Sequence, residues 1–432
     1  MIWNKEKECM SRDELTAIQS ESLVKLVDYV YNNATYYREK MQKIGLLPSD
    51  IKGIEDIEKL PFTTKDDLRD NYPFGLFTVP KKDIVRIHAS SGTTGKATVV
   101  GYTRNDLDVW AECVARCFAM ADVSKDDIIQ IAYGYGLFTG GLGAHSGAEK
   151  IGAMVVPMST GNSKKLTTMM VDFGATAIAC TPSYLLHIAE VLEQEKLIDK
   201  IKLKSAICGA EPWTDKMRND IESRLNIKAY DIYGLSEIMG PGVACDCQYH
   251  NGLHVCEDHF YPEIVSSSNL KQVKAGETGE LVFTTLTKQG LPLIRYRTKD
   301  LTSIDYSTCQ CGRTSARISK FKGRVDDMLI IRGVNVFPSQ VEAALVDIKE
   351  VSPHYMMIVD RVNNLDSLEI QVELNTNYFI DEIKGLESLT KKISNTINQA
   401  LGINAKIKIV EPMTLKRSEG KAVHVIDNRK IY

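Results

Sequence analysis

The stretch AMVVPMSTGNSKKLTTMMVDFGATAIACTP, residues 153–182, contains two apolar runs separated by an amphipathic segment. The runs at 153–158 and 175–182 are short and apolar, which is typical of buried strands. Residues 163–173 between them show the apolar spacing of a helix. Strand, helix and strand in this order predict a βα unit whose strands belong to a largely parallel sheet.

The same alternation continues on both sides of this stretch. Further apolar runs at 127–133, 205–210 and 229–234 indicate buried strands. Helical patterns lie between the strands, near residues 105–120, 183–195 and 214–224. We therefore predict an α/β domain with a mostly parallel sheet. In such sheets, ligands bind at the carboxyl ends of the strands, where the connecting loops gather.

The regions outside this sheet differ in pattern. Residues 1–80 indicate a mainly helical lead-in, which begins with a capping box at residues 11–14. From about Gly279, two strands without an intervening helix indicate a small β region. Beyond Arg324 the order βαββαβ predicts a small ferredoxin-like α+β domain. The two expected domains are residues 1–325 and 326–432.

The composition is that of a globular protein without attraction to nucleic acid or membranes. The chain has 432 residues, of which 44% are hydrophobic and 25% charged, and its formal net charge is −3. Because there is no basic excess, we expect no nucleic-acid partner, and no apolar run approaches the roughly 18 residues of a membrane span. The N-terminus lacks the apolar core of a signal peptide, so we expect a cytoplasmic protein with reduced cysteines.

Residues 90–96, SSGTTGK, form a loop with few side chains and one lysine. Its backbone N–H groups, hydroxyls and ammonium group are donors of the kind that cradle phosphates. The loop is not a Walker A motif, because Ser90 stands where that motif has its first glycine and Ala97 follows Lys96. A P-loop kinase or GTPase is therefore disfavoured, and a flexible surface turn is the plain alternative.

Five ordered motifs resemble those of the adenylate-forming superfamily, which contains acyl-CoA synthetases, peptide-synthetase adenylation domains and luciferases. They are SSGTTGKATVVGYT (90–103), YGLSE (233–237), YRTKDL (296–301), GRVDDMLIIRGVNVFPSQVE (323–342) and RSEGKA (417–422). Within the superfamily, the stretches that resemble the phenylacetate–CoA ligase family are YGYGLFTGGLG (133–143), GAEPW (209–213) and GLHVCEDHFYPEI (252–264). The resemblance covers nearly the whole chain. It implies an ATP-dependent ligase that forms an acyl-adenylate and then an acyl-CoA thioester, with release of AMP and pyrophosphate.

The resemblance also implies roles for single residues around the nucleotide. The glycine-rich loop, with Thr93 as a catalytic residue, would hold the β- and γ-phosphates. Glu237 would be a catalytic residue that binds Mg²⁺, a hard cation that prefers carboxylate and phosphate oxygens. Without the resemblance, Glu237 would be interpreted as a surface carboxylate and Asp300 as a turn aspartate. The residues expected to contact the nucleotide are Ser90, Ser91, Gly92, Thr94, Gly95, Lys96, Gly209, Ala210, Glu211, Pro212, Asp231, Tyr233, Gly234, Ser236, Asp300 and Arg324.

In the C-terminal domain, Lys421 is the catalytic residue that the resemblance implies. It would reach the α-phosphate and the substrate carboxylate in the first half-reaction. Its loop must then leave so that coenzyme A can enter, which implies rotation of the C-terminal domain about a hinge at Asp326. Arg332 and Gly333 would then bind coenzyme A along the path of its thiol.

The stretch 133–143 indicates that the acid is aromatic. Aromatic side chains stand there beside glycines, which would form a flat slot for an aryl ring, and no lysine or arginine is present to bind a second charge. Phenylacetate is our first choice. Indoleacetate or a hydroxylated arylacetate stays open, because GAHSG (143–147) and Cys256 stand where bulkier aromatic residues are common in the family. The residues expected to contact the acid are Tyr135, Phe138, Gly140, Gly141 and Ile238.

Cysteines and histidines cluster in residues 245–259 and 309–311, which include two C-x-C pairs. Thiolate and imidazole ligands in this number predict a tetrahedral Zn²⁺ site, which is structural when all four ligands come from the protein. Cys245 or Cys256 could replace one chosen ligand, and reduced thiols without a metal are the alternative. The chosen ligands are Cys247, His254, Cys309 and Cys311.

Two other functions stay open at this point. An adenylating enzyme could load a carrier protein or stop at the adenylate, and a nucleotide- and zinc-binding scaffold would have no catalysis. Retention of Lys421, Glu237 and Asp300 argues against the scaffold. The expected partners are therefore small molecules, namely an aryl carboxylic acid, ATP with Mg²⁺, and coenzyme A. A homodimer is left open.

Overall fold

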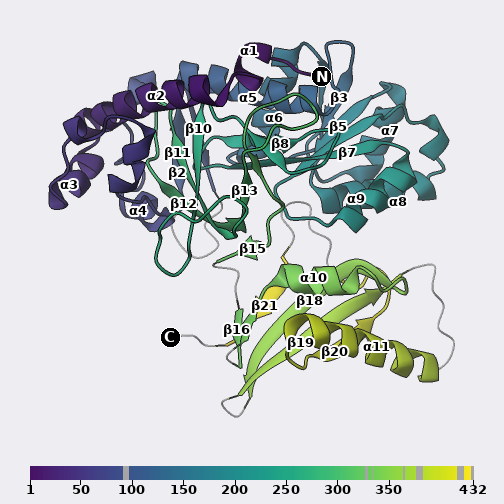
Figure 1. Ribbon diagram of the computed structural model, residues 1–432. Helices are drawn as coiled ribbons and strands as arrows, with labels where there is room; N and C mark the ends of the chain where they lie inside the picture. Colours follow the sequence, from purple (N-terminus) through teal and green to yellow (C-terminus); the bar gives the residue numbers. More distant parts are fainter. Residues whose placement is uncertain are drawn as a thin grey trace.

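The computed structural model of the protein describes residues 1–90, 97–325, 329–332, 334–362, 365–375, 383–415 and 423–429. Figure 1 shows a large part that runs to β15 (Gly323–Arg324) and a small part that begins at β16 (Leu329–Ile331). Helix α10 (Pro338–Leu345) lies on the side of the small part that faces the large one. Within the described residues, no helix is both long and apolar enough to cross a bilayer.

A nine-stranded sheet forms the centre of the large part, in the order β13-β14-β9-β8-β7-β6-β5-β3-β4. The strands are β3 (Ile128–Ile131), β4 (Met154–Pro157), β5 (Ala177–Cys180), β6 (Ser205–Gly209), β7 (Lys228–Leu235), β8 (Gly240–Asp246), β9 (Leu253–Val255), β13 (Ile304–Asp305) and β14 (Arg317–Ile318). Strands β3 to β7 pair in parallel, and the four towards the β13 edge pair antiparallel. The helices that accompany the sheet are α5 (Arg104–Met120), α6 (Thr139–Ile151), α7 (Ser163–Asp172), α8 (Pro182–Gln194) and α9 (Asp215–Leu225). The predicted α/β class is confirmed.

The βα unit at residues 153–182 is present, but its two strands are not neighbours. Strand β3 lies between β4 and β5, so α7 carries the chain across one strand of the sheet. Strand β4 forms the edge of the sheet and leaves Met154 63% exposed, whereas every residue of β5 is buried. Because β3 to β7 are parallel, the loops that follow β3, β6 and β7 meet at one edge of the sheet.

Local caps fix where the helices begin. Thr103 and Asp106 form a capping box at the start of α5, and Thr181 followed by proline begins α8. The predicted capping box of Ser11 and Glu14 is present at the first turn of α2. The helical lead-in consists of α1 (Lys5–Glu8), α2 (Arg12–Asn33), α3 (Thr35–Lys43) and α4 (Lys65–Asp70).

An antiparallel sheet and a hairpin complete the large part. The sheet has the order β10-β11-β12-β15, and it contains the β region predicted from Gly279. The two strands of the hairpin flank the glycine-rich loop, with Ala89 paired to Val99. The new strands are β1 (Arg86–Ala89), β2 (Val99–Tyr102), β10 (Phe260–Val265), β11 (Gly279–Thr285) and β12 (Tyr296–Thr302).

The small part has a hydrophobic core of its own and a four-stranded sheet in the order β20-β19-β18-β21. The expected α+β class is confirmed, with one difference in detail. Among the described strands, β16 pairs with β17 alone, because the chain folds back at once into a hairpin. Strand β21 takes the edge beside β18 instead. The remaining elements are β17 (Val334–Val336), β18 (Val351–Val362), β19 (Leu365–Leu374), α11 (Ile383–Leu401), β20 (Lys406–Val410) and β21 (Val425–Asp427).

Candidate active site and metal centre

The hairpin β1–β2 brings the base of the glycine-rich loop next to Glu237. Thr98 Oγ1 donates a hydrogen bond to Oε1 of Glu237 at 3.3 Å. Ser90 is hydrogen-bonded to Thr98 through both hydroxyls, and Ser90 N donates to Thr98 O at 3.0 Å. Ser90 and Thr98 therefore close the base of the loop. The expected phosphate-binding residues Ser91, Gly92, Thr93, Thr94, Gly95 and Lys96 lie outside the described residues.

The Glu237 carboxylate is buried beside a cation from the helical lead-in. Glu237 is 5% exposed, and Lys65 Nζ lies 3.7 Å from its Oε1. Sequence reasoning missed Lys65, because it lies in the first turn of α4 after the cap Thr64 and looks like an ordinary helix start. A carboxylate between a hydroxyl and an ammonium group, at the mouth of a loop of phosphate donors, has the chemistry to hold a hard divalent cation.

Asp300 forms a cluster with two of the other residues expected to contact the nucleotide. Its Oδ2 accepts a hydrogen bond from the Tyr233 hydroxyl at 2.6 Å, and its Oδ1 accepts one from Arg324 Nη1 at 2.8 Å. Strand pairing sets Asp300 opposite Arg324, and the Phe321 ring packs 4.4 Å from that of Tyr233. The carboxylate is thus fixed with charge-assisted contacts on both oxygens. A fixed carboxylate of this kind can accept sugar hydroxyls.

The loop after β6 approaches β7 very closely. A Cβ on Gly209 would lie 2.2 Å from Ile232 O, so only glycine permits this packing. Ala210 has a positive φ of 73°, and Glu211 Oε1 accepts a hydrogen bond from Ser183 N, in the first turn of α8, at 2.6 Å. The loop 209–212 is therefore held between β7 and the start of α8, at the edge of the sheet where ligands bind.

Asp231, in the middle of β7, lies beside a second carboxylate. Burial and the neighbouring Asp246 raise the pKa of Asp231 to about 7. Asp246 in turn accepts hydrogen bonds from Asp231 N and from Arg218 Nη2, both at 2.8 Å. Asp231 is therefore mostly protonated below pH 7, and in that state it can donate a hydrogen bond.

This shift predicts a pH-dependent gain in stability for Asp231→Asn. A raised folded-state pKa contributes stability that is present below the unfolded pKa near 4 and is lost as the pH rises through 7. Asparagine mimics the protonated acid at every pH, so its advantage grows over this window. We expect the gain in melting temperature to be about 5 °C larger at pH 8 than at pH 5. Calorimetry at the two pH values measures the melting temperatures of Asp231→Asn and of the exposed control Asp126→Asn. An equal gain for Asp231→Asn at both pH values would refute the raised pKa of Asp231.

The glycines expected to contact the acid lie in the first turn of α6. A Cβ on Gly140 would come 2.8 Å from the Phe138 ring, and one on Gly141 would come 2.7 Å from Gly134 O. Both glycines therefore let the loop after β3 pack against the helix. Because glycine has no side chain, they also leave the first turn of α6 bare at the edge of the sheet where ligands bind.

The other residues expected to contact the acid differ in burial. Ile238 is fully buried in the turn that carries Glu237, whereas Phe138 is 47% exposed. Tyr135 is half-buried, and its hydroxyl is hydrogen-bonded to His145 Nδ1 at 3.2 Å. His145 stands in the stretch 143–147, and its contact with Tyr135 gives the expected aryl side a polar group.

The small part presents α10 to the loop 209–212. Burial and the Glu211 carboxylate raise the pKa of Glu342 on α10 to about 7. A carboxylate of the large part has this effect only when it lies close to the small part. Arg332, expected to contact coenzyme A, donates instead to Asp366 O at 2.8 Å, within the small part. Its role stays a prediction. Lys421, Asp326 and Gly333 lie outside the described residues.

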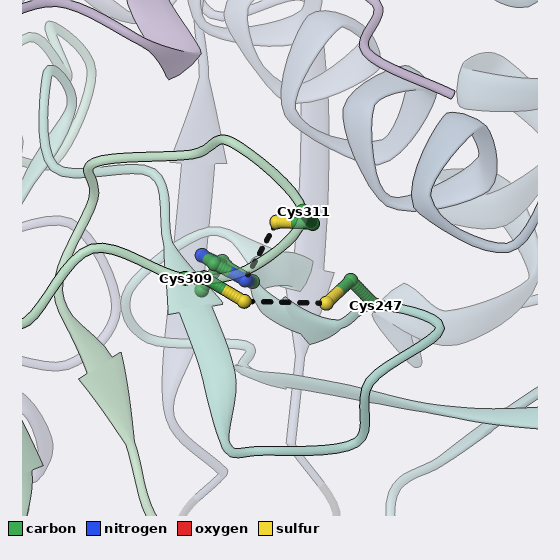
Figure 2. Close-up of side chains that lie close together, drawn as sticks. Cys247, Cys309 and Cys311 are labelled. Carbon is green, nitrogen blue, oxygen red and sulfur yellow. Dashed lines mark hydrogen bonds between the residues drawn. The ribbon is translucent and has the colours of Figure 1, made fainter.

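Three cysteines and a histidine come together between the sheet edge and the loop after β13. The ligand atoms of Cys247, His254, Cys309 and Cys311 all lie within 4.8 Å of one another. Figure 2 shows the thiols of Cys247 and Cys309 facing each other, with their sulfur atoms 3.8 Å apart. Cys311 Sγ lies 3.5 Å from His254 Nε2. The structure therefore brings together the four residues that the sequence predicted as ligands.

The surroundings of this cluster suit a metal ion. Hydrogen bonding with the Cys247 thiol and with His254 lowers the pKa of Cys311 well below its usual value, which favours the thiolate form that binds metal ions. His254 Nδ1 is hydrogen-bonded to Ser315 Oγ at 3.2 Å, which turns Nε2 towards the thiols. The two alternative ligands lie apart from this cluster. Cys256, the first residue after β9, has its Sγ on Gly242 O, and Cys245 Sγ contacts Cys117 O.

Comparison with known proteins identifies the family. The family model for AMP-binding enzymes matches residues 12–286, and that for the AMP-binding enzyme C-terminal domain matches residues 333–429. A phenylacetate-coenzyme A ligase of Thermus thermophilus is 46% identical over 100% of both chains. The phenylacetate-coenzyme A ligase of Escherichia coli strain K12 is 49% identical, over 98% of this chain and 97% of its own.

The solved structure of a 2-hydroxyisobutyryl-CoA ligase is similar over the same extent. In its postadenylation state, with 2-HIB-AMP bound, the TM-score is 0.93 at 30% identity, over 99% of this chain and 93% of that one. In its thioesterification state, with coenzyme A also bound, the TM-score is 0.74 at the same coverage. The two parts of this chain are therefore oriented as in the postadenylation state. The chain belongs to the AMP-binding, adenylate-forming enzymes, and within them it is an AMP-forming acid–CoA ligase of the phenylacetate–CoA ligase family.

Proposed function

We propose that the protein activates phenylacetate, or an arylacetate of similar size, with ATP and transfers the acyl group to coenzyme A. The observation that carries the proposal is the 3.3 Å contact between Thr98 and Glu237, which sets a buried carboxylate at the base of the glycine-rich loop. The choice of acid is supported by relatives named phenylacetate-coenzyme A ligase at 46% and 49% identity over nearly the full chain. The absence of lysine and arginine from residues 133–143 favours a substrate without a second charge.

In the first half-reaction, an oxygen of the substrate carboxylate attacks the α-phosphorus and the bond to pyrophosphate breaks. The loop 90–96 holds the β- and γ-phosphates, and Lys421 stabilises the charge that develops on the α-phosphate. Mg²⁺, held by Glu237, would neutralise phosphate charge. Asp300 and Arg324 bind the ribose, and the loop 209–212 lines the adenine.

In the second half-reaction, the thiolate of coenzyme A attacks the acyl carbon and AMP leaves. The domain of residues 326–432 rotates about Asp326, which removes Lys421 and brings Arg332 and Gly333 towards the thiol. The acid lies against α6, with Tyr135 and Phe138 beside it and the small residues Gly140 and Gly141 below. Rotation separates the two steps in time.

ATP–pyrophosphate exchange tests this function directly. The acids offered are phenylacetate, hydroxyphenylacetates, indoleacetate and benzoate, each with Mg·ATP. We expect exchange to be fastest with phenylacetate, and AMP release to require coenzyme A. Exchange without coenzyme A-dependent turnover would favour a carrier-protein partner. No exchange with any acid would favour the non-catalytic scaffold.

The Asp300 cluster gives a specific expectation. Asp300→Asn removes the charge that pairs with Arg324, 2.8 Å away, and weakens the acceptors for the ribose hydroxyls. We expect KM for ATP to rise about thirtyfold, while KM for the acid changes less than threefold. Initial rates with each substrate varied in turn measure the split. Equal increases in both KM values would show that Asp300 is not specific to the nucleotide.

We also propose that Cys247, His254, Cys309 and Cys311 hold a structural Zn²⁺ ion. The proposal is supported by a donor set of three sulfurs and one imidazole nitrogen, all within 4.8 Å of one another. Four protein ligands fill a tetrahedral site, so the ion would crosslink the loop after β13 to β8 and β9 and leave no position for substrate.

A further inference from the structure

Lys288 lies beneath the turn that carries Glu237. Its ammonium group donates hydrogen bonds to Glu237 O at 3.0 Å and to Ile238 O at 2.8 Å. Lys288 is only 2% exposed, and within the described residues it forms no ion pair. The cost of burying this ammonium group is reduced by the two carbonyl contacts and by the nearby negative charges of Asp106 and Glu237.

Tyr102 holds the two ends of the same turn. Its hydroxyl lies 3.2 Å from Ser236 O and 2.9 Å from Met239 O, and shares its one hydrogen between them. The ring is fully buried, stacks on Trp110 at 5.1 Å, and carries the Lys288 ammonium group 4.9 Å from its centroid. All four carbonyl oxygens of residues 236–239 are therefore held by two side chains, which also contact each other.

The two side chains come from the elements that carry the rest of the site. Tyr102 ends β2, the strand whose start follows Thr98 and the glycine-rich loop. Lys288 follows β11 in the chain and precedes β12, the strand that carries Asp300. The turn of Glu237 is thus tied both to the phosphate-binding hairpin and to the sheet that binds the ribose.

We propose that Lys288 and Tyr102 are positioning residues that fix the Glu237 carboxylate where it binds the Mg²⁺ of Mg·ATP. The inference rests on the proposed role of Glu237. With the four carbonyls held, the backbone of the turn has one conformation, and the carboxylate meets the metal without rearrangement. Loss of either side chain should weaken magnesium-dependent binding and leave the nucleotide slot intact.

The test separates metal-dependent from metal-independent binding in Lys288→Met and Tyr102→Phe. The second variant removes one oxygen atom and keeps the stacked ring, so it tests the proposal even if the first does not fold. We expect the Mg²⁺ concentration for half-maximal ATP binding to rise about tenfold in each variant. The Kd for AMP without magnesium should change less than twofold. Calorimetric titration and pyrophosphate exchange at varied Mg²⁺ give both values.

Arg116→Met is the matched control for a buried cation that lies elsewhere. Arg116 is 3% exposed and forms a bidentate pair with Asp258 at 2.8 and 2.9 Å. Its loss should lower the melting temperature without a change in magnesium dependence. Wild-type magnesium dependence in Tyr102→Phe, or a parallel loss of AMP binding, would overturn the positioning role. Glu237→Gln distinguishes failure of the positioning role from failure of the role of Glu237 itself. If this variant binds Mg·ATP like wild type, the proposed Mg²⁺ binding by Glu237 fails as well; if it does not, only the positioning by Lys288 and Tyr102 fails.

Discussion

Lys421→Ala is expected to slow formation of the acyl-adenylate by about a thousandfold or more, which is the loss typical of a group that stabilises transition-state charge. The same variant should convert supplied phenylacetyl-adenylate and coenzyme A to the thioester within about threefold of the wild-type rate. The expectation follows from the proposed mechanism, in which Lys421 acts while charge develops on the α-phosphate and its loop would leave before the thiol attacks. The two half-reactions should therefore respond very differently to one substitution.

Two assays measure these half-reactions separately. Pyrophosphate exchange reports adenylation, and thioester formation from synthetic adenylate reports the second step. Lys408→Ala, an exposed lysine on β20, is the matched control and should leave both unchanged. Equal loss in both assays would remove Lys421 from the first step and assign it to folding or to general nucleotide binding.

The orientation of the two parts bears on this expectation. The chain superposes better on the postadenylation state of 2-hydroxyisobutyryl-CoA ligase, at a TM-score of 0.93, than on its thioesterification state, at 0.74. Helix α10 accordingly faces the loop 209–212, with Glu342 close to Glu211. In the proposed mechanism the small part would leave this contact before thioester formation, by rotation about the proposed hinge at Asp326.

The elements that local signals specify were predictable from the sequence. Apolar runs such as residues 175–182 and the caps at Ser11 and Thr103 place strands and helices without knowledge of contacts. The neighbours of each strand were not predictable in this way. Strand β3 lies between β4 and β5, and β16 stays outside the small sheet, because pairing is decided by contacts distant in the sequence.

The residues of the candidate site were likewise predictable only in part. The family resemblance assigned both Asp300 and Arg324 to the nucleotide, but it did not predict the ion pair between them. The four proposed metal ligands follow from spacing and ligand chemistry. Lys65 and Lys288 were missed, because a lysine after a cap or after a strand gives no sign of burial or of its distant partner. A single lysine between the strand sequence LVFTTL and the apolar stretch LPLI was the one available signal for Lys288. Its meaning depends on the turn at Glu237, about fifty residues away.

Removal of the proposed zinc ion should loosen the N-terminal segment together with the loop that binds the metal. The loop that carries Cys309 and Cys311 also anchors the N-terminal segment. Arg313 Nε donates to Glu8 Oε2 at 2.6 Å, and Thr314 Oγ1 donates to Met10 O at 2.5 Å. In Cys309→Ser we expect the metal content to fall from about one ion per chain to less than a tenth. The melting temperature should drop by about 10 °C, as loss of a tightly bound ligand predicts.

Elemental analysis, calorimetry and limited proteolysis follow these changes together. Because Arg313 and Thr314 hold residues 1–10 only while their loop is fixed, trypsin should cut near Arg12 in Cys309→Ser before it cuts the parallel sheet. Cys256→Ser is the matched control, since Cys256 is an equally buried thiol that lies on Gly242 O, apart from the four ligands. It should keep its metal and its N-terminal segment. Full metal content in Cys309→Ser, or loss of metal in Cys256→Ser, would show that the ligand set is wrong. The same structure places the Cys309 sulfur among the four ligand atoms and the Cys256 sulfur on Gly242 O, away from them.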